Sequence, residues 1–160
     1  MREIHRERIE VHVAGICLRE TEDGISVLIA KRRETRTLYP GLWECGGGQV
    51  HAGENFEEAI ARQMREELGI IIEEARPSST YEIVVSDLSQ GKIPGLKFVC
   101  FWKEYVNGGT EPTCDGREHS ECRWQSVDDL SEFDFIPGIR EDIKEGVEIF
   151  SCERRKIHNQ

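Results

Sequence analysis

Short apolar runs separated by turn-forming residues predict paired strands near the start of the chain. His12 to Leu18 is apolar with a mild alternation, and a second apolar run covers Ile25 to Ala30. Glu22-Asp23-Gly24 lies between the two runs, and Asp-Gly is a strong signal for a tight turn between antiparallel strands. The pattern therefore predicts a β-hairpin. Its second strand leads into the basic residues Lys31 to Arg33 and then into a loop that contains Pro40-Gly41.

The strongest helical signal covers Asn55 to Leu68. Asn55 is a good N-cap residue, and Glu58, three positions further on, completes a capping-box pattern. Apolar side chains then recur at helical spacing, and Gly69 is placed to end the helix in the left-handed conformation. Just upstream, Gly46 to Gly48 form a flexible segment that allows the backbone to approach another group closely.

The second half of the chain alternates between strand and helix signals. The further predicted elements are strands at 70–72, 81–85 and 97–105, a polar loop at 86–95, an edge segment at 122–125 and a helix at 137–150. Pro137 suits the first turn of that last helix, and an apolar stripe follows it. The polar and basic tail after residue 150 is expected to fray. This order of elements predicts an α/β fold with a mixed sheet covered by helices.

Composition and charge narrow the class of protein. A length of 160 residues, with 38% hydrophobic and 32% charged residues, is expected of one ordered domain. A formal net charge of −10 argues against binding to a nucleic-acid polymer, because an acidic surface repels the phosphate backbone. The charged stretch Met1 to Glu10 does not look like a secretory signal, and no segment reaches the roughly 20 apolar residues that span a bilayer. We therefore expect a cytoplasmic monomer or homodimer without a membrane partner.

The six cysteines favour free thiols over disulfides. None forms a CxxC pair, and a chain without a secretory signal is expected to keep its thiols reduced. Cys114, His119 and Cys122 form an alternative set of zinc ligands, although their spacing matches no tight zinc motif and a fourth ligand is not obvious.

Acidic side chains cluster on the helix that follows the glycine-rich segment. Glu66 and Glu67 are adjacent, and Gln63 lies one turn away beside both of them. Hard cations such as Mg²⁺ prefer oxygen ligands, so a loop carbonyl and helix carboxylates together can hold such an ion and bridge it to substrate phosphates. The alternative interpretation is an acidic helix face that is simply solvated.

The spacing of these residues resembles a known motif. From Gly48 to Ile70 the chain reads GQVHAGENFEEAIARQMREELGI, which closely resembles the Nudix box, G-x5-E-x7-R-E-U-x-E-E-x-G-U, where U is aliphatic. The residues in register are Gly48, Glu54, Arg62, Met64, Glu66, Glu67, Gly69 and Ile70. The resemblance implies a Nudix fold over residues 1–160, which is an α/β/α sandwich around a mixed sheet. It also implies an enzyme in which water attacks phosphorus and a diphosphate bond is hydrolysed.

The resemblance further implies roles for individual residues. Glu66 and Glu67 match metal-binding glutamates, and Gly47 matches the position whose carbonyl joins the metal shell. Arg62 matches the arginine that orients the carboxylates, and Glu54 matches a glutamate at the junction of loop and helix. The expected cofactor is Mg²⁺, for which Mn²⁺ can substitute. Such an ion neutralises the phosphates, positions the water and lowers its pKa.

One position departs from the motif. Gln63 stands where the family has a glutamate, and a neutral amide cannot act as a general base near pH 7. Either the base comes from elsewhere or catalysis is impaired. Glu118, six residues before Trp124, resembles the loop glutamate of MutT-type members and is our first candidate for a further catalytic and metal-binding residue. Asp115 is the second candidate, and Glu121 is interpreted as an ordinary loop charge.

The expected substrate is a small nucleotide, and four residues are candidates for binding it. These are Arg32, Gly48, Trp43 and Tyr81, although core packing is the stronger interpretation of Trp43. The residues that often mark ADP-ribose and dinucleoside polyphosphate members, near Ser86 and Leu88, are absent. By elimination we expect a MutT-like enzyme that splits a nucleoside triphosphate, including modified ones, into monophosphate and pyrophosphate. The alternative is a nucleotide- or metabolite-binding module in which Gln63 has weakened catalysis.

Overall fold

The first two strands form the predicted hairpin. β1 (His12–Thr21) pairs antiparallel with β2 (Gly24–Arg32), and Thr21 faces Gly24 across the Asp-Gly turn. The structure is a computed structural model that describes residues 6–160. The charged start of the chain, for which no secretory signal is predicted, falls partly on residues 1–5, outside that description. Within residues 6–160, no helix combines the length and apolarity needed to cross a bilayer.

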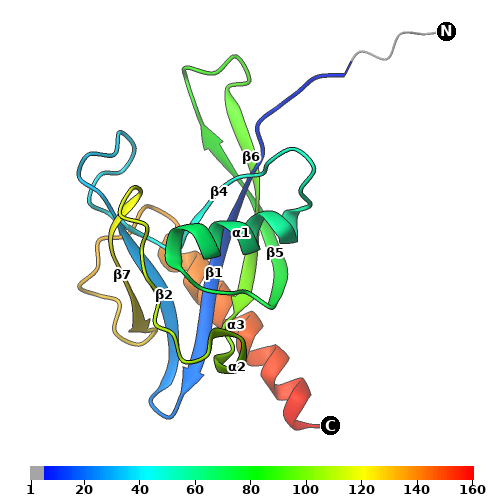
Figure 1. The fold of residues 1–160 in the computed structure, drawn as a ribbon, viewed down its shortest axis with the longest axis vertical. Coiled ribbons are helices and arrows are strands. Elements are labelled where there is room, and N and C mark those ends of the chain that lie inside the picture. The colour runs from blue at the N-terminus through cyan, green and yellow to red at the C-terminus, as the bar shows by residue number, and fades with distance from the viewer. Residues whose placement is uncertain (1–5) are drawn as a thin grey trace, which may run out of the picture.

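The sheet is mixed, and its centre is a parallel pair (Figure 1). β1 runs parallel to β6, whereas the other strand pairs are antiparallel. β5 pairs with the outer side of β6, β3 and β7 pair with β2, and β4 pairs with β1. The bounds of these strands are Trp43–Glu44 for β3, Gly47–Gln49 for β4, Glu74–Val84 for β5, Lys92–Phe101 for β6 and His119–Ser126 for β7.

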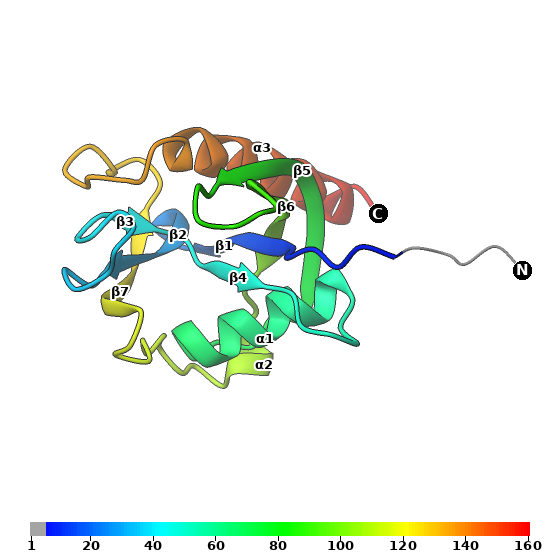
Figure 2. The ribbon, with the colours of Figure 1, turned by 90° about the horizontal axis from the view of Figure 1, so that it is seen from above.

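Helices cover both faces of this sheet (Figure 2). α1 (Phe56–Leu68) and the short α2 (Glu104–Asn107) lie on one side, and α3 (Ile139–His158) lies on the other. Alternate residues of β1 serve the two cores, since Cys17 packs beneath α1 whereas Ile16 and Leu18 pack beneath α3. The predicted α/β/α sandwich with a mixed sheet is therefore confirmed.

Several predicted boundaries differ from those in the structure, including the start of β5 at Glu74 and of β7 at His119. Ile70 to Ile72 is not a strand, because the Asn107 side chain donates to the Ile71 carbonyl (3.2 Å) and accepts its N–H (2.8 Å), so these groups have no strand partner. β6 begins at Lys92, inside the predicted loop, and ends at Phe101. The tail after residue 150 does not fray but continues α3 to His158, with basic side chains in the last turn that complement the helix dipole.

Candidate active site

Helix α1 is held in place by the capping residues that its sequence predicts. The Asn55 side chain accepts the N–H of Glu58 (2.8 Å), and the Glu58 carboxylate accepts the N–H of Asn55 (2.9 Å). At the other end Gly69 adopts a left-handed φ of 65°. The helix therefore starts and stops at fixed points, and the side chains of its middle turns project in fixed directions.

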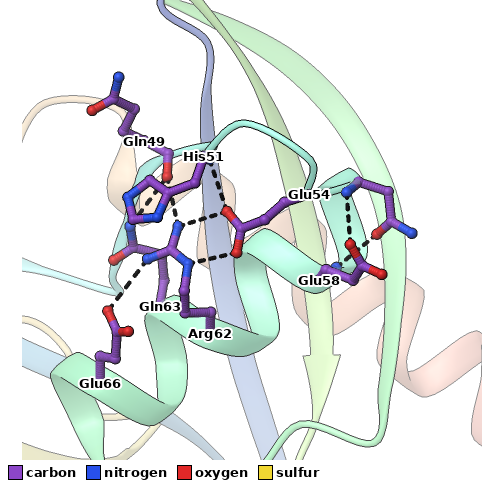
Figure 3. A network of polar contacts seen from close by, with 8 residues as sticks. Gln49, His51, Glu54, Glu58, Arg62, Gln63 and Glu66 are labelled. Carbon is purple, nitrogen blue, oxygen red and sulfur yellow. Dashed lines mark hydrogen bonds and ion pairs between the residues drawn. The ribbon is translucent and has the colours of Figure 1, made fainter.

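Arg62 joins this helix to the glycine-rich loop (Figure 3). Its guanidinium donates to both oxygens of Glu54 (2.6 and 2.9 Å), to the Gln49 carbonyl (2.8 Å) and to Glu66 (3.3 Å). The hydrogen bonds from Arg62 are the main reason that the pKa of Glu54 falls to about 2. Glu54 also accepts the N–H of His51 (2.8 Å), so Arg62 and Glu54 together lock the loop, and Arg62 orients the exposed carboxylate of Glu66.

Gln63 is buried directly beneath the glycine-rich strand. Only 8% of it is exposed, and its Nε2 donates weakly to the Gln49 carbonyl (3.4 Å). A Cβ on Gly48 would lie 2.4 Å from that nitrogen, so the missing side chain of Gly48 makes room for Gln63. Gly47 has a φ of 150°, and a Cβ there would lie 2.3 Å from the Val13 carbonyl oxygen. Glycine is thus required at position 47 by contact with the backbone, whereas a side chain at position 48 would displace the amide of Gln63.

Glu67 has the most perturbed carboxyl group of the helix. Burial is the main reason that the pKa of Glu67 rises to about 8. The negative charges of Glu44, Glu118 and Asp115 add to this rise, and the Arg32 guanidinium partly opposes it. Three carboxylates from two further segments of the chain thus lie near Glu67. These negative charges repel one another unless a bound cation or protons offset them.

The loop that precedes β7 brings two of these carboxylates to the end of α1. The N–H of Thr113 donates to the Leu68 carbonyl (2.9 Å), and the N–H of Asp115 donates to the Glu67 carbonyl (3.1 Å). The Asp115 carboxylate in turn accepts the N–H of Glu118 (3.2 Å). The last carbonyls of α1 therefore serve as the docking point for the loop.

Glu118 is fixed from the opposite side by arginines of the β2–β3 loop. Its carboxylate pairs with Arg36 (3.0 Å), and its carbonyl accepts the N–H of Arg33 (3.1 Å). The side chain of Glu118 remains about one third exposed, and its charge acts on Glu67. Glu121 is exposed on β7, opposite Lys31, and is not among the charges that perturb Glu67.

Glu44 is a residue of the site that sequence reasoning missed. It pairs in register with Ala30, which packs in the core beneath α1, so Glu44 faces the same side of the sheet as that helix. Its Oε1 accepts hydrogen bonds from Arg32 Nη1 (3.1 Å) and His119 Nε2 (2.7 Å), which help to lower the pKa of Glu44 against the effect of its burial. The signal that could have revealed it is a charged residue placed between the buried Trp43 and Cys45.

The donors of the site suit a hard divalent cation. They include the carboxylates near Glu67, whose mutual repulsion would fall if a cation bound beside that residue. In the part of the chain that is described, no three His, Cys, Asp or Glu side chains converge closely enough to hold an ion alone. Mg²⁺ keeps several waters and shares substrate phosphates, so a partial set of protein ligands is what it requires.

The zinc alternative is not supported. Cys114 and Cys122 contact each other, but the third proposed ligand, His119, directs its Nε2 to Glu44. These three side chains do not form a metal-binding group in residues 6–160. The cysteines there are free thiols, as the sequence predicts.

The four candidates for substrate binding lie in different places. Gly48 faces the side chain of Gln63 on α1. Arg32 is committed to Glu44 and to the Leu38 carbonyl (2.8 Å). Trp43 is 9% exposed and meets Phe133 edge-on, as core packing requires. Tyr81 lies beneath Lys97, which pairs with Asp142 of α3, so it stands on the opposite face of the sheet from α1.

The chain matches a family model across most of its length. The description of that model is the NUDIX domain, and the match covers residues 9–145. Among curated proteins, the nucleoside triphosphatase NudI of Escherichia coli is 26% identical over 132 residues, which cover 81% of this chain and 92% of that protein.

Solved structures with the same fold include two from bacteria. The NUDIX domain of Shewanella oneidensis NrtR, complexed with ADP ribose, has a TM-score of 0.72 and 14% identity, and the match covers 91% of this chain and 90% of that one. The MutT NUDIX hydrolase of Burkholderia pseudomallei has a TM-score of 0.64 and 23% identity, with 87% and 98% covered. At these identities the structural likeness concerns the fold.

Proposed function

Since the chain belongs to the NUDIX domain family and is a pyrophosphohydrolase, we propose that it uses Mg²⁺ to split a nucleoside triphosphate into monophosphate and pyrophosphate. Mn²⁺ is expected to substitute. The proposed substrate is a small nucleotide, because the net charge of −10 opposes binding of a nucleic-acid polymer. The choice of a triphosphate is supported by the likeness to a protein named nucleoside triphosphatase.

The observation that carries the proposal is the set of carboxylates around Glu67. The pKa of Glu67 is raised first by burial and then by the charges of these carboxylates, so the site has a surplus of negative charge that a divalent cation would offset. When bound, the cation would neutralise the substrate phosphates and lower the pKa of the attacking water. Glu66, Glu67, Glu118 and the Gly47 carbonyl are the ligands we propose for it.

The remaining residues have positioning roles in this proposal. Arg62 holds the carboxylate of Glu66 toward the site and ties it to Glu54. Gln63 fills the space beside Gly48 with a neutral side chain. Glu118 is the carboxylate, about one third exposed, that can accept a proton from water, since Gln63 cannot do so.

A substrate panel tests the proposal. The purified protein is incubated with Mg²⁺ and with nucleoside triphosphates, ADP-ribose or a dinucleoside tetraphosphate, and the products are separated by ion-exchange chromatography. We expect monophosphate and pyrophosphate from triphosphates, near-complete loss in Glu67→Gln, and wild-type turnover in the matched variant Glu121→Gln. Cleavage of ADP-ribose alone, or full activity of Glu67→Gln, would contradict the proposal.

Gln63 favours a second candidate function, a nucleotide-binding module. Its amide is buried and replaces a carboxylate at the centre of the proposed cation site. In that case a nucleotide with Mg²⁺ would raise the melting temperature without any turnover. The same panel therefore separates the two candidates when each sample is also followed by thermal denaturation.

A further inference from the structure

Glu44 connects the two loops that flank the candidate active site. Its Oε1 accepts a hydrogen bond from Arg32 on β2 and another from His119 on β7. We propose that Glu44 is a positioning residue, which acts through His119 to hold Glu118 at the distance from Glu67 that catalysis needs. This inference rests on the proposed function, in which Glu118 takes the proton from water.

The first branch of the network closes the β2–β3 loop. Arg32 donates through Nε to the Leu38 carbonyl (2.8 Å) and through Nη1 to Glu44 (3.1 Å). Its backbone N–H donates to the Leu42 carbonyl (2.8 Å), and its carbonyl accepts the N–H of Gly41 (3.1 Å). Arg32 is thus surrounded by the loop that it closes, and that loop carries the arginines that contact Glu118.

The second branch reaches Glu118 directly along the chain. His119 is the next residue, its side chain is 1% exposed, and it starts β7 at a register shift opposite Arg32. A buried imidazole that donates to Glu44 at 2.7 Å has little freedom to move. The backbone of Glu118 is held by this anchor on one side and by the N–H of Arg33 (3.1 Å) on the other.

Glu44 lies on the face of the sheet that α1 covers, which is the face that carries Glu67. Glu44 shares the face of Ala30, which belongs to the same core cluster as Met64 and Leu68 of α1. The charge of Glu44 also acts on Glu67, in agreement with a position close to it. Both donors reach the same oxygen, Oε1, so a glutamine at this position could accept both hydrogen bonds but would lack the negative charge that strengthens them.

A double-mutant cycle tests whether Glu44 acts through Glu118. We expect Glu118→Gln to lower kcat by about 10²-fold to 10⁴-fold, as loss of a proton acceptor does. Glu44→Gln should lower kcat by about 10-fold with little change in KM, because misplacement of a catalytic group affects the transition state. The double variant should be no slower than Glu118→Gln alone, since the two residues act as one unit. Glu121→Gln, on the same strand, is the control that leaves kcat unchanged.

Variants of His119 keep the inference testable if Glu44→Gln does not fold. His119→Gln retains an N–H donor near the position of Nε2 and should keep most of kcat. His119→Met has a similar volume without a donor and should match the loss of Glu44→Gln. Loss of kcat that is equal in His119→Gln and His119→Met would overturn the inference.

The outcomes separate this inference from the proposed function. A wild-type protein without turnover would refute the proposed function itself. An active wild type in which the effects of Glu44→Gln and Glu118→Gln multiply would refute only the inference, because Glu44 would then act independently of Glu118.

Discussion

Replacement of Gln63 by glutamate restores the family residue at the one position where the chain departs from the motif. Glutamine and glutamate have nearly the same volume, so the space beside Gly48 accommodates either side chain. The variant loses the N–H that donates to the Gln49 carbonyl (3.4 Å) and places a carboxylate oxygen against that carbonyl. It also adds a charge to a residue that is 8% exposed.

The cost to stability follows from these contacts. The Gln49 carbonyl keeps the N–H of Arg62 (2.8 Å), so loss of the Gln63 hydrogen bond lowers the free energy of unfolding by about 0.5–1.5 kcal/mol. The introduced carboxylate oxygen, which has no donor at that place, costs about 1–3 kcal/mol more. We therefore expect Gln63→Glu to be about 2–4 kcal/mol less stable than the wild type without divalent cations. Mg²⁺ at about 100 times its dissociation constant stabilises a folded protein by about 2.7 kcal/mol. The deficit of the variant against the wild type should narrow in Mg²⁺, because the added carboxylate makes the variant bind the cation more tightly. Turnover should rise, because the added carboxylate strengthens the cation site.

The assay is urea denaturation in EDTA and in Mg²⁺, combined with turnover on the preferred nucleotide. Gln63→Met is the matched control, since it fills the same space without a ligand and should show a deficit that Mg²⁺ does not reduce. The same loss of stability in EDTA and in Mg²⁺, together with unchanged or lower turnover, would show that Gln63 does not limit catalysis.

Three further substitutions test the frame of the site. Gly47→Ala would place a Cβ 2.3 Å from the Val13 carbonyl oxygen, so we expect a loss of about 1–3 kcal/mol or more in thermal denaturation. Asn55→Ala removes the capping interaction with Glu58 and should cost about 1 kcal/mol in urea unfolding, with serine at this position restoring most of it. The folded-state pKa of Glu54 is about 2, below its ordinary 4.5, so its contribution is complete above pH 4.5 and is lost as the pH falls toward 2. Glu54→Gln should therefore be less stable than the wild type near neutral pH, and denaturation across pH should show the gap closing between about 4.5 and 2; a gap that does not change with pH would contradict this.

The sequence was sufficient to predict those features of the structure that depend on residues close together in the chain. The capping box at Asn55 and Glu58, the stop at Gly69 and the hairpin turn all depend on residues within a few positions. The alignment of Arg62 with Glu66 is likewise a contact across one helical turn. These features form the helix side of the site, and they could be predicted from the sequence.

Contacts between distant segments could not be predicted in the same way. The Asn107 side chain binds the backbone of Ile71, and no pattern near residue 71 reveals this. The place of Glu44 in the site could not be predicted either, because its partner His119 lies 75 positions away in the sequence. Arg32, a candidate for substrate binding, donates through Nε to the Leu38 carbonyl and through Nη1 to Glu44, and its neighbours in sequence do not reveal the second contact. Long-range pairing therefore decided which charged groups belong to the site.

The parallel pairing of β1 with β6 has a consequence for how the chain folds. His12 pairs with Gly95 and Leu18 with Phe101, so the middle of the sheet joins the first strand to one made much later. Closing such a long loop costs entropy before any contact offsets it, and parallel pairing over this separation is slow. During synthesis β1 must remain without its central neighbour until β6 leaves the ribosome, and its apolar residues are exposed to aggregation for that interval.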